Sequence, residues 1–237
     1  FVNKMDRTGA DFYNVLDMMK DRFGANPVPL NIPIGDGATF TGVVDLIEMK
    51  AINYAEDDGQ NFDITDIPDN MKDKADEWRN HLLEEVASND EDLMEKYLEG
   101  EDIAIDELKT AIRKSCISGD IVPMLCGSAF KNKGVQSLLD YIIDFLPSPL
   151  DVGAIKGFDV DDSSKELERS PSIDTPFSAL AFKIMTDPFV GRLTFFRVYS
   201  GSVSTGDFIY NPTSGKKERV GRLMLMHSRK TEERKTV

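Results

Sequence analysis

Two stretches decide the fold: Phe1-Val2-Asn3-Lys4-Met5-Asp6 at the start of the chain, and Ile121-Val122-Pro123-Met124-Leu125-Cys126-Gly127-Ser128-Ala129-Phe130 in its middle. Each is an apolar run, typical of a buried parallel strand, that leads directly into small and polar residues. A helical pattern follows each of them. Because parallel α/β sheets bind ligands beyond the carboxyl ends of their strands, we expect the two polar loops to lie together at one sheet edge.

The patterns around these loops predict the flanking elements. Apolar residues at helical spacing predict a helix from Phe12 to Phe23, with Gly24 as its stop. The apolar residues from Val135 to Leu146 predict a strongly amphipathic helix that ends before the Pro147-Ser148-Pro149 sequence. Together with the two strands, these helices favour an α/β unit.

The stretch between the two loops predicts a mixed α+β segment. Alternating apolar residues predict a strand over 28–34, and a glycine-rich turn precedes a returning strand over 40–45. From Glu56 to Asp106 the chain is acidic and mainly helical in pattern, and a third helix is expected to stop near Gly119. We interpret the apolar stripes of these helices as ordinary core packing.

The last third of the chain changes character. Residues 151–175 are polar and read as a linker between an α/β domain at 1–150 and a second domain at 176–237. Four short strands predict an antiparallel β-barrel, namely 177–185, 193–199, 207–210 and 219–226. Four strands are too few to close a small barrel, so we expect a partial barrel with an open edge at its last strand.

Composition restricts the class of protein. The 237 residues carry a net charge of −14, and no apolar run reaches the ~20 residues that span a bilayer. The chain has no signal-peptide pattern, which favours the cytoplasm, and Cys116 and Cys126 are too few for a disulfide framework. Because the chain opens on Phe1 inside an apparent strand, we expect an internal piece of a longer protein.

The residues of the two loops suit the recognition of guanine. The Asp6 carboxylate can accept hydrogen bonds from the N1–H and N2–H₂ edge of guanine, a pattern that adenine does not present. Asn3 can tie the loops together, and the stem of Lys4 can lie along the base. Ser128 can steady Asp6, and the Ala129 N–H can donate to guanine O6. The first motif alone also fits a surface turn, but a second suitable loop favours a nucleotide site.

Asn3-Lys4-Met5-Asp6-Arg7-Thr8-Gly9-Ala10 and Gly127-Ser128-Ala129-Phe130-Lys131-Asn132-Lys133-Gly134-Val135-Gln136 resemble the fourth and fifth guanine-nucleotide motifs of the bacterial elongation factor G family. The segment from Ala181 to Phe195 resembles the start of that family's second domain. The resemblance implies the end of a P-loop GTPase domain, with an insert over about 27–118. It also implies GTP or GDP at Asn3, Lys4, Asp6, Ser128, Ala129 and Phe130, and a ribosomal partner contacted through RNA and the stalk protein.

The phosphate-handling half of such a domain is not in this sequence. It contains no G-x-x-x-x-G-K-[ST] motif, and no Asp-x-x-Gly followed by the His that orients the attacking water in the family. The resemblance therefore implies a parent GTPase with bound Mg²⁺, while this chain is expected to hold no catalytic residue and no metal ligand. We expect the chain by itself to be inactive.

Several readings stay open from sequence alone. The parent could be a ribosome-protection, release or mitochondrial relative, or the chain could be a non-catalytic acidic interaction module. His81 and His227 are expected to be structural or solvated, and the acids of 56–106 lack the order of a calcium loop. A basic cluster is either plain barrel surface or a contact for RNA phosphates; it comprises Lys216, Lys217, Arg219, Arg222, Arg229 and Lys230.

Overall fold

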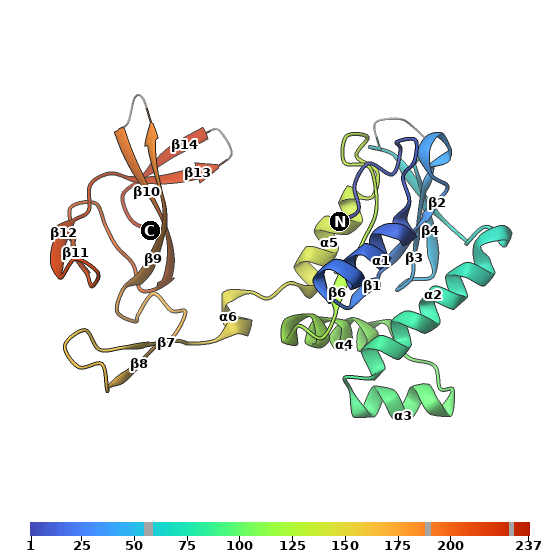
Figure 1. Cartoon of the computed structure of the whole chain (residues 1–237), viewed down its shortest axis with the longest axis horizontal. Coiled ribbons are helices and arrows are strands. Elements are labelled where there is room, and N and C mark those ends of the chain that lie inside the picture. The colour runs from blue at the N-terminus through green and yellow to red at the C-terminus, as the bar shows by residue number, and fades with distance from the viewer. Residues whose placement is uncertain (55–58, 188–190, 228–229) are drawn as a thin grey trace. The chain divides into compact units, whose positions relative to one another are not determined.

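The computed structural model describes residues 1–54, 59–187, 191–227 and 230–237 (Figure 1). The chain divides into two compact units, Phe1–Leu146 and Pro147–Val237, and each is described by itself. A mixed α/β unit is followed by antiparallel strands, which confirms the predicted fold class. Glu56 and Arg229, together with the Pro188-Phe189-Val190 part of the second-domain segment, lie outside the described residues.

The parallel strands that carry the two loops are confirmed. Strand β6 (Val122–Met124) pairs in parallel with β1 (Pro27–Pro29). Just after β6, Cys126 forms a parallel bridge with Val2, and the Val2 N–H donates to the Leu125 carbonyl at 2.7 Å. Because the neighbouring runs are parallel, both polar loops leave the sheet at the same edge.

The first helix follows the expected chemistry at both ends. Helix α1 (Phe12–Phe23) begins where the Asp11 side chain accepts the Asn14 N–H at 3.0 Å. It ends at Gly24, whose φ of +58° is a conformation that glycine adopts without a steric penalty. The loop of Asn3 to Asp6 is therefore fixed between a strand and a capped helix.

Helix α5 (Val135–Phe145) buries a face that overlaps only in part with its predicted aliphatic stripe, of which Leu138 packs against the core. Tyr141 and Phe145 are buried, with their rings stacked at 5.2 Å. Four aliphatic side chains of the predicted stripe are exposed, namely Leu139, Ile142, Ile143 and Leu146. The helix is apolar on two sides, so periodicity alone does not say which side packs.

The insert contains a four-stranded antiparallel sheet in the order β2-β3-β4-β5. Its strands are β2 (Asn31–Ile34), β3 (Gly42–Asp45), β4 (Lys50–Tyr54) and β5 (Phe62–Thr65), and η1 (Gly37–Thr39) lies in the turn between β2 and β3. The β2–β3 hairpin matches the sequence prediction. Strand β4 was not predicted, and β5 corrects the expectation of a mainly helical stretch there, because its pairing with β4 supplies the backbone partners.

The strand predicted over 28–34 is in fact two strands in two sheets. Leu30 is the point of change: its N–H donates to the Met124 carbonyl at 2.8 Å, while its carbonyl accepts the Leu46 N–H at 3.0 Å. The residues from Pro27 to Pro33 are all buried, so the apparent alternation does not mark one solvated face. The change of sheet at Leu30 joins the insert directly to the parallel strands.

Three helices complete the insert, as predicted: α2 (Asp69–Ala87), α3 (Glu91–Glu99) and α4 (Ile105–Ser118). Helix α2 packs against α3, α4 and β1, and Trp78 of α2 stacks on Tyr13 of α1 with ring centroids 5.5 Å apart. The apolar core is one continuous cluster that includes residues of α1, the parallel strands and the insert. The insert and the base-loop region therefore share a core.

The second unit begins at Pro147, so it contains the whole of the segment predicted as a linker. Helix α6 (Pro149–Val152) is followed by an antiparallel hairpin of β7 (Ile155–Phe158) and β8 (Glu166–Arg169). Lys156 of β7 lies 3.5 Å from Glu166 and 3.6 Å from Glu168, so cross-strand charge pairs accompany the hairpin. Its polar, exposed character is what made the segment read as a linker.

The remaining strands form three antiparallel hairpins rather than the four strands expected. The predicted strand over 219–226 is broken in two, because residues 220–222 carry no strand pairing. The described hairpins do not join into a closed barrel. The expected open edge at the last strand is covered in part, because Val237, just beyond β14, exchanges backbone hydrogen bonds with Val203 at 2.8 and 3.0 Å. The hairpins are β9 (Ser178–Asp187) with β10 (Gly191–Ser200), β11 (Phe208–Asn211) with β12 (Lys216–Arg219), and β13 (Leu223–His227) with β14 (Lys230–Arg234).

Within the part of the chain that the structure describes, no helix combines the length and the apolar character needed to cross a membrane.

Candidate functional site

Asn3 links the two loops. Its side-chain Oδ1 accepts the Lys4 N–H at 2.8 Å and the Ala129 N–H at 2.9 Å. The second contact joins residues that are 126 positions apart in the chain. A single side-chain oxygen thus fixes the start of one loop against the middle of the other.

The first loop is held in an unusual backbone conformation. Lys4 has a φ of +67°, which costs a non-glycine residue about 1–2 kcal/mol. The Asn3 contact to the Lys4 N–H and the turn in which the Arg7 N–H donates to the Lys4 carbonyl at 3.0 Å stabilise it. Strained residues of this kind cluster at ligand sites, where the surroundings determine their geometry.

Asp6 and Ser128 form the second link between the loops. The Ser128 hydroxyl donates to Asp6 Oδ1 at 2.7 Å, and Ser128 itself is almost fully buried. This hydrogen bond, with smaller contributions from Arg7 and Lys131, holds the pKa of Asp6 below its ordinary value. The carboxylate is therefore ionised at neutral pH, and its remaining lone pairs can accept hydrogen bonds from a ligand.

The second loop is folded tightly on itself. The N–H of Ser128 donates to the Lys133 carbonyl at 2.9 Å, and the Lys133 N–H donates back at 3.0 Å. Gly134, with φ +79°, then starts α5, and a Cβ at that position would lie 2.7 Å from the Cys126 carbonyl oxygen. Only glycine fits this close approach.

The six residues predicted for guanine are not equally placed. The structure brings Asn3, Asp6, Ser128 and Ala129 together, whereas the Lys4 side chain is exposed and Phe130 is 94% exposed. The Ala129 N–H, which the sequence assigned to guanine O6, here donates to Asn3. Donation from this N–H to a guanine base stays a prediction. It requires that the N–H either bonds to the base and the Asn3 oxygen together or gives up its hydrogen bond to Asn3.

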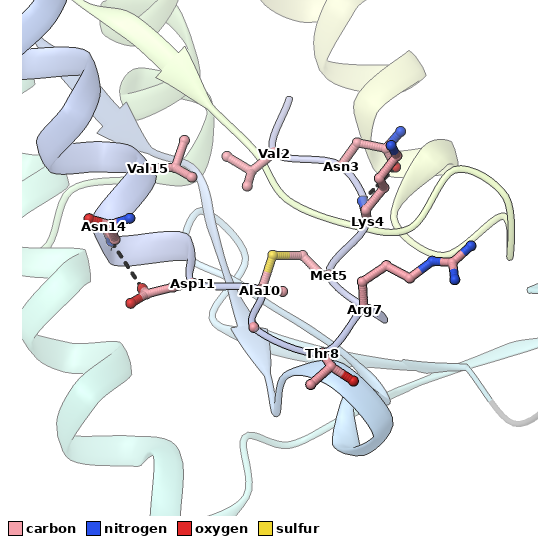
Figure 2. A pocket seen from close by; sticks show the side chains of 11 residues that line it. Val2, Asn3, Lys4, Met5, Arg7, Thr8, Ala10, Asp11, Asn14 and Val15 are labelled. Atoms are coloured by element: carbon pink, nitrogen blue, oxygen red, sulfur yellow. Dashed lines mark hydrogen bonds between the residues drawn. The ribbon is translucent and has the colours of Figure 1, made fainter.

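A pocket of about 280 Å³ lies beside the first loop (Figure 2). Asn3 and Lys4 line it together with Val2, Ala10 and Val15, but Asp6, Ser128 and Ala129 do not. Figure 2 shows the aliphatic side chains of Val2 and Val15 on the side of the pocket opposite Arg7. The hollow is therefore adjacent to the candidate base site and is not that site.

Sequence reasoning missed the residues of the insert that support the second loop. Tyr54 on β4 accepts the Gly134 N–H at 2.8 Å through its hydroxyl, and the Gly59 carbonyl accepts from the Gln136 side chain at 3.0 Å. Tyr54 and Gly134 are 80 positions apart, and nothing local to either residue signals the contact.

The other candidate residues lie apart from these loops. In the basic cluster, the described members Lys216, Lys217, Arg219, Arg222 and Lys230 are exposed. His81 is half-buried with its ring edge against Trp78, and His227 is exposed. Cys126 is buried and Cys116 half-buried, both as free thiols. Among the described residues, no group of His, Cys, Asp and Glu side chains is placed to hold a metal ion.

Two family models match the chain. Residues 1–148 match the elongation factor Tu GTP binding domain, and residues 176–237 match elongation factor G domain 2. Among solved structures, a crystal structure of a protein from Thermus thermophilus is similar, with a TM-score of 0.75 and 26% sequence identity. The similarity covers 100% of this chain and 32% of that one, so the chain spans about a third of the length of the solved protein that it matches.

Proposed function

Because this chain belongs to the elongation factor Tu GTP binding domain family of translational GTPases, we propose that it is part of elongation factor G, the GTP-dependent ribosomal translocase. The match of the second unit to elongation factor G domain 2 favours this member of the family. In this proposal the complete protein hydrolyses GTP, works in the cytoplasm with the ribosome, and moves transfer RNA and messenger RNA after peptide transfer.

The observation that carries the proposal is the double link between the two loops. Asn3 and Ser128 each join one loop to the other, and the ionised Asp6 carboxylate lies between them. A fixed carboxylate at the carboxyl edge of parallel strands suits the N1–H and N2–H₂ edge of guanine. This chain then supplies base recognition, while residues of the parent that are not in this sequence handle the phosphates and Mg²⁺.

We expect this 237-residue chain to bind GDP with only a millimolar dissociation constant. About three hydrogen bonds to the base, each worth ~0.5–3 kcal/mol, stand against a cost of ~4 kcal/mol or more for immobilising the nucleotide. Tight binding in P-loop proteins comes largely from the phosphates, held by backbone N–H groups, a Lys and Mg²⁺. Calorimetric titration with GDP measures this directly. A micromolar constant would reveal a phosphate site within this sequence.

The insert offers an acidic surface for a protein partner. A groove between α3 and α4, about 340 Å³ in volume, is lined by Asp90, Asp92, Lys96, Asp106 and Glu107 around apolar Leu93 and Ala111. Such a surface repels nucleic-acid phosphates and favours a basic protein face. We assign the ribosomal stalk protein to this side of the insert, and ribosomal RNA to the exposed basic cluster of the second unit.

Reversing two charges in this groove should weaken stimulation of GTP hydrolysis by the stalk while leaving basal hydrolysis unchanged. Asp92→Lys with Asp106→Lys removes two exposed acids near the groove, and Asp161→Lys makes the same kind of change on the second unit. Deleting residues 56–106 is not a usable test, because it removes the core residues Leu82 and Val86. Stalk stimulation of GTP hydrolysis is measured for both variants at low and at moderate salt, because salt screens the interaction between exposed charges. Full stimulation of the doubly reversed protein would contradict the assignment.

Two alternative functions can be distinguished from this proposal by experiment. A ribosome-protection or release relative would bind GTP but fail to support translocation, whereas a mitochondrial translocase would differ in the ribosome on which it works. A non-catalytic acidic interaction module would not bind guanine nucleotide at all. Measuring GDP binding by the complete gene product separates the GTPases from the module, and a translocation assay separates the GTPases from one another.

A further inference from the structure

The insert sheet reaches the second base loop through one buried hydroxyl. Tyr54, on β4, is 5% exposed, and its hydroxyl accepts the Gly134 N–H at 2.8 Å. Gly134 ends the loop that carries Ser128 and starts α5. A buried N–H that loses its acceptor costs the full free energy of its desolvation, so this contact fixes where the loop meets the helix.

The backbone of Gly59 makes a second contact with the same loop. A Cβ at Gly59 would lie 2.4 Å from the Lys131 carbonyl oxygen, so only glycine allows this approach. The Gly59 carbonyl also accepts the Gln136 side-chain N–H at 3.0 Å. Two separate segments of the insert therefore touch the loop between Gly127 and Gln136.

The first base loop also touches the insert. The Gly37 N–H, in the turn after β2, donates to the Met5 carbonyl at 2.9 Å. Met5 stands between Lys4 and Asp6, and it is itself 1% exposed. Each of the two loops is thus hydrogen-bonded to the insert at a residue close to its candidate base contacts.

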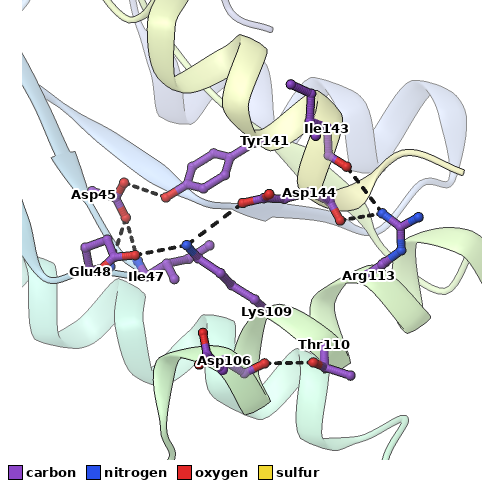
Figure 3. A network of polar contacts seen from close by, with 10 residues as sticks. All are labelled: Asp45, Ile47, Glu48, Asp106, Lys109, Thr110, Arg113, Tyr141, Ile143 and Asp144. Carbon is purple, nitrogen blue, oxygen red and sulfur yellow. Dashed lines mark hydrogen bonds and ion pairs between the residues drawn. The ribbon is translucent and has the colours of Figure 1, made fainter.

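The far end of α5 is anchored to the insert as well (Figure 3). The Tyr141 hydroxyl hydrogen-bonds to the buried Asp45 carboxylate, at the end of β3. Lys109 of α4 lies 3.0 Å from Glu48 and 3.9 Å from Asp144. Figure 3 shows these side chains converging from α4, α5 and the segment after β3. Helix α5 therefore does not shift freely when the loop at its start is strained.

We propose that Tyr54 is a positioning residue for guanine recognition, through which the insert sets the geometry of the Ser128–Ala129 loop. The inference rests on the proposed function, because it assumes that this loop contacts guanine. Tyr54 itself does not touch the base: it holds Gly134, and Gly134 holds the loop. The insert and the base site then form one coupled unit, in which a change at either one alters the other.

The test uses the complete gene product with Tyr54→Phe, which removes only the accepting hydroxyl. Gly59→Ala is a second variant, which pushes the loop sterically at an independent place. Tyr97→Phe is the matched control, because Tyr97 lies on α3, which packs on α2. For each protein we would measure the dissociation constant for a fluorescent GDP analogue, and KM and kcat for GTP, well below the unfolding temperature.

Tyr54→Phe should weaken GDP binding about threefold to tenfold, the equivalent of one buried neutral hydrogen bond. KM for GTP should rise by a similar factor while kcat at saturation stays unchanged, since the phosphate-handling residues are untouched. A purely structural role would lower thermal stability without changing KM in the folded protein. Gly59→Ala should weaken GDP binding in the same direction, and Tyr97→Phe should match the wild type.

Each contrary result has a distinct meaning. Wild-type GDP affinity in both Tyr54→Phe and Gly59→Ala would overturn the positioning role and leave the proposed function intact. A kcat that falls as far as KM rises would also overturn it, because positioning of the base alone does not slow the chemical step. Failure of the wild-type protein to bind GDP would overturn the proposed function, and the positioning role with it.

Discussion

Replacing Asp6 by Asn in the complete protein should lower its affinity for GTP about tenfold to a hundredfold and raise its affinity for XTP. The carboxylate accepts two hydrogen bonds from guanine, and a charge-assisted hydrogen bond contributes about 1.5–3 kcal/mol. An Asn side chain presents one acceptor and one donor instead, and this donor suits the carbonyl at position 2 of xanthine. The fold of the loop should survive, because Asn retains an oxygen that can accept the Ser128 hydroxyl.

Competition of GTP against XTP for the same protein measures this exchange of preference. Asp17→Asn is the matched control. Asp17 is an exposed acid of α1, so this substitution makes the same chemical change outside the two loops. An unchanged preference for GTP in the Asp6 variant would remove that carboxylate from the base site. It would also leave the Ser128 contact as a purely structural hydrogen bond.

Asp45→Ala should lower the free energy of unfolding by about 3–5 kcal/mol, because it leaves three donors without an acceptor and each unsatisfied buried donor costs about 1–3 kcal/mol. The Asp45 carboxylate is buried and accepts the Ile47 N–H at 2.8 Å, the Glu48 N–H at 3.0 Å and the Tyr141 hydroxyl. Alanine leaves these three groups without their acceptor. Equilibrium denaturation of the purified variant at neutral pH measures the loss, and a loss below about 1 kcal/mol would show that water replaces the carboxylate.

Asp45→Asn tests the charge separately from the hydrogen bonds. Burial raises the pKa of Asp45 above its ordinary value, although the hydrogen bonds from Tyr141, Glu48 and Ile47 oppose the shift. The folded state therefore binds the proton more tightly than the unfolded state, and this contribution to stability is lost as pH rises through the raised pKa. Asparagine does not titrate, so the free energy of unfolding of the variant, relative to that of the wild type, should be higher at pH 7 than at pH 4. The opposite trend would mean that the buried carboxylate is stabilised as an anion.

The sequence was most informative where structure depends on neighbours along the chain. The helices α1, α2 and α4 and the two polar loops follow from local periodicity and from residues such as Gly24. The same is true of the candidate base residues Asn3 and Asp6, which follow a strand at a fixed spacing. These features depend on the local sequence, because an α-helix makes its backbone hydrogen bonds within its own segment.

The features that sequence reasoning missed depend on distant partners. Strand β4 exists because it pairs with β3 and β5, and its residue Tyr54 meets Gly134 only in the folded chain. The change of sheet at Leu30 likewise needs Met124 on one side and Leu46 on the other. The β7–β8 hairpin has no buried face to give an alternating pattern, so its polar sequence looked like a linker.

The stack of Trp78 on Tyr13 has a practical consequence. Trp78 is the only tryptophan in the sequence, and it sits where α2 of the insert meets α1. Its ultraviolet emission is therefore an intrinsic optical label for that junction, free of background from other indoles. A red shift of the emission would mark the moment when α2 separates from α1 and water reaches the ring. Stopped-flow mixing with denaturant could thus time the opening of this junction without any attached dye.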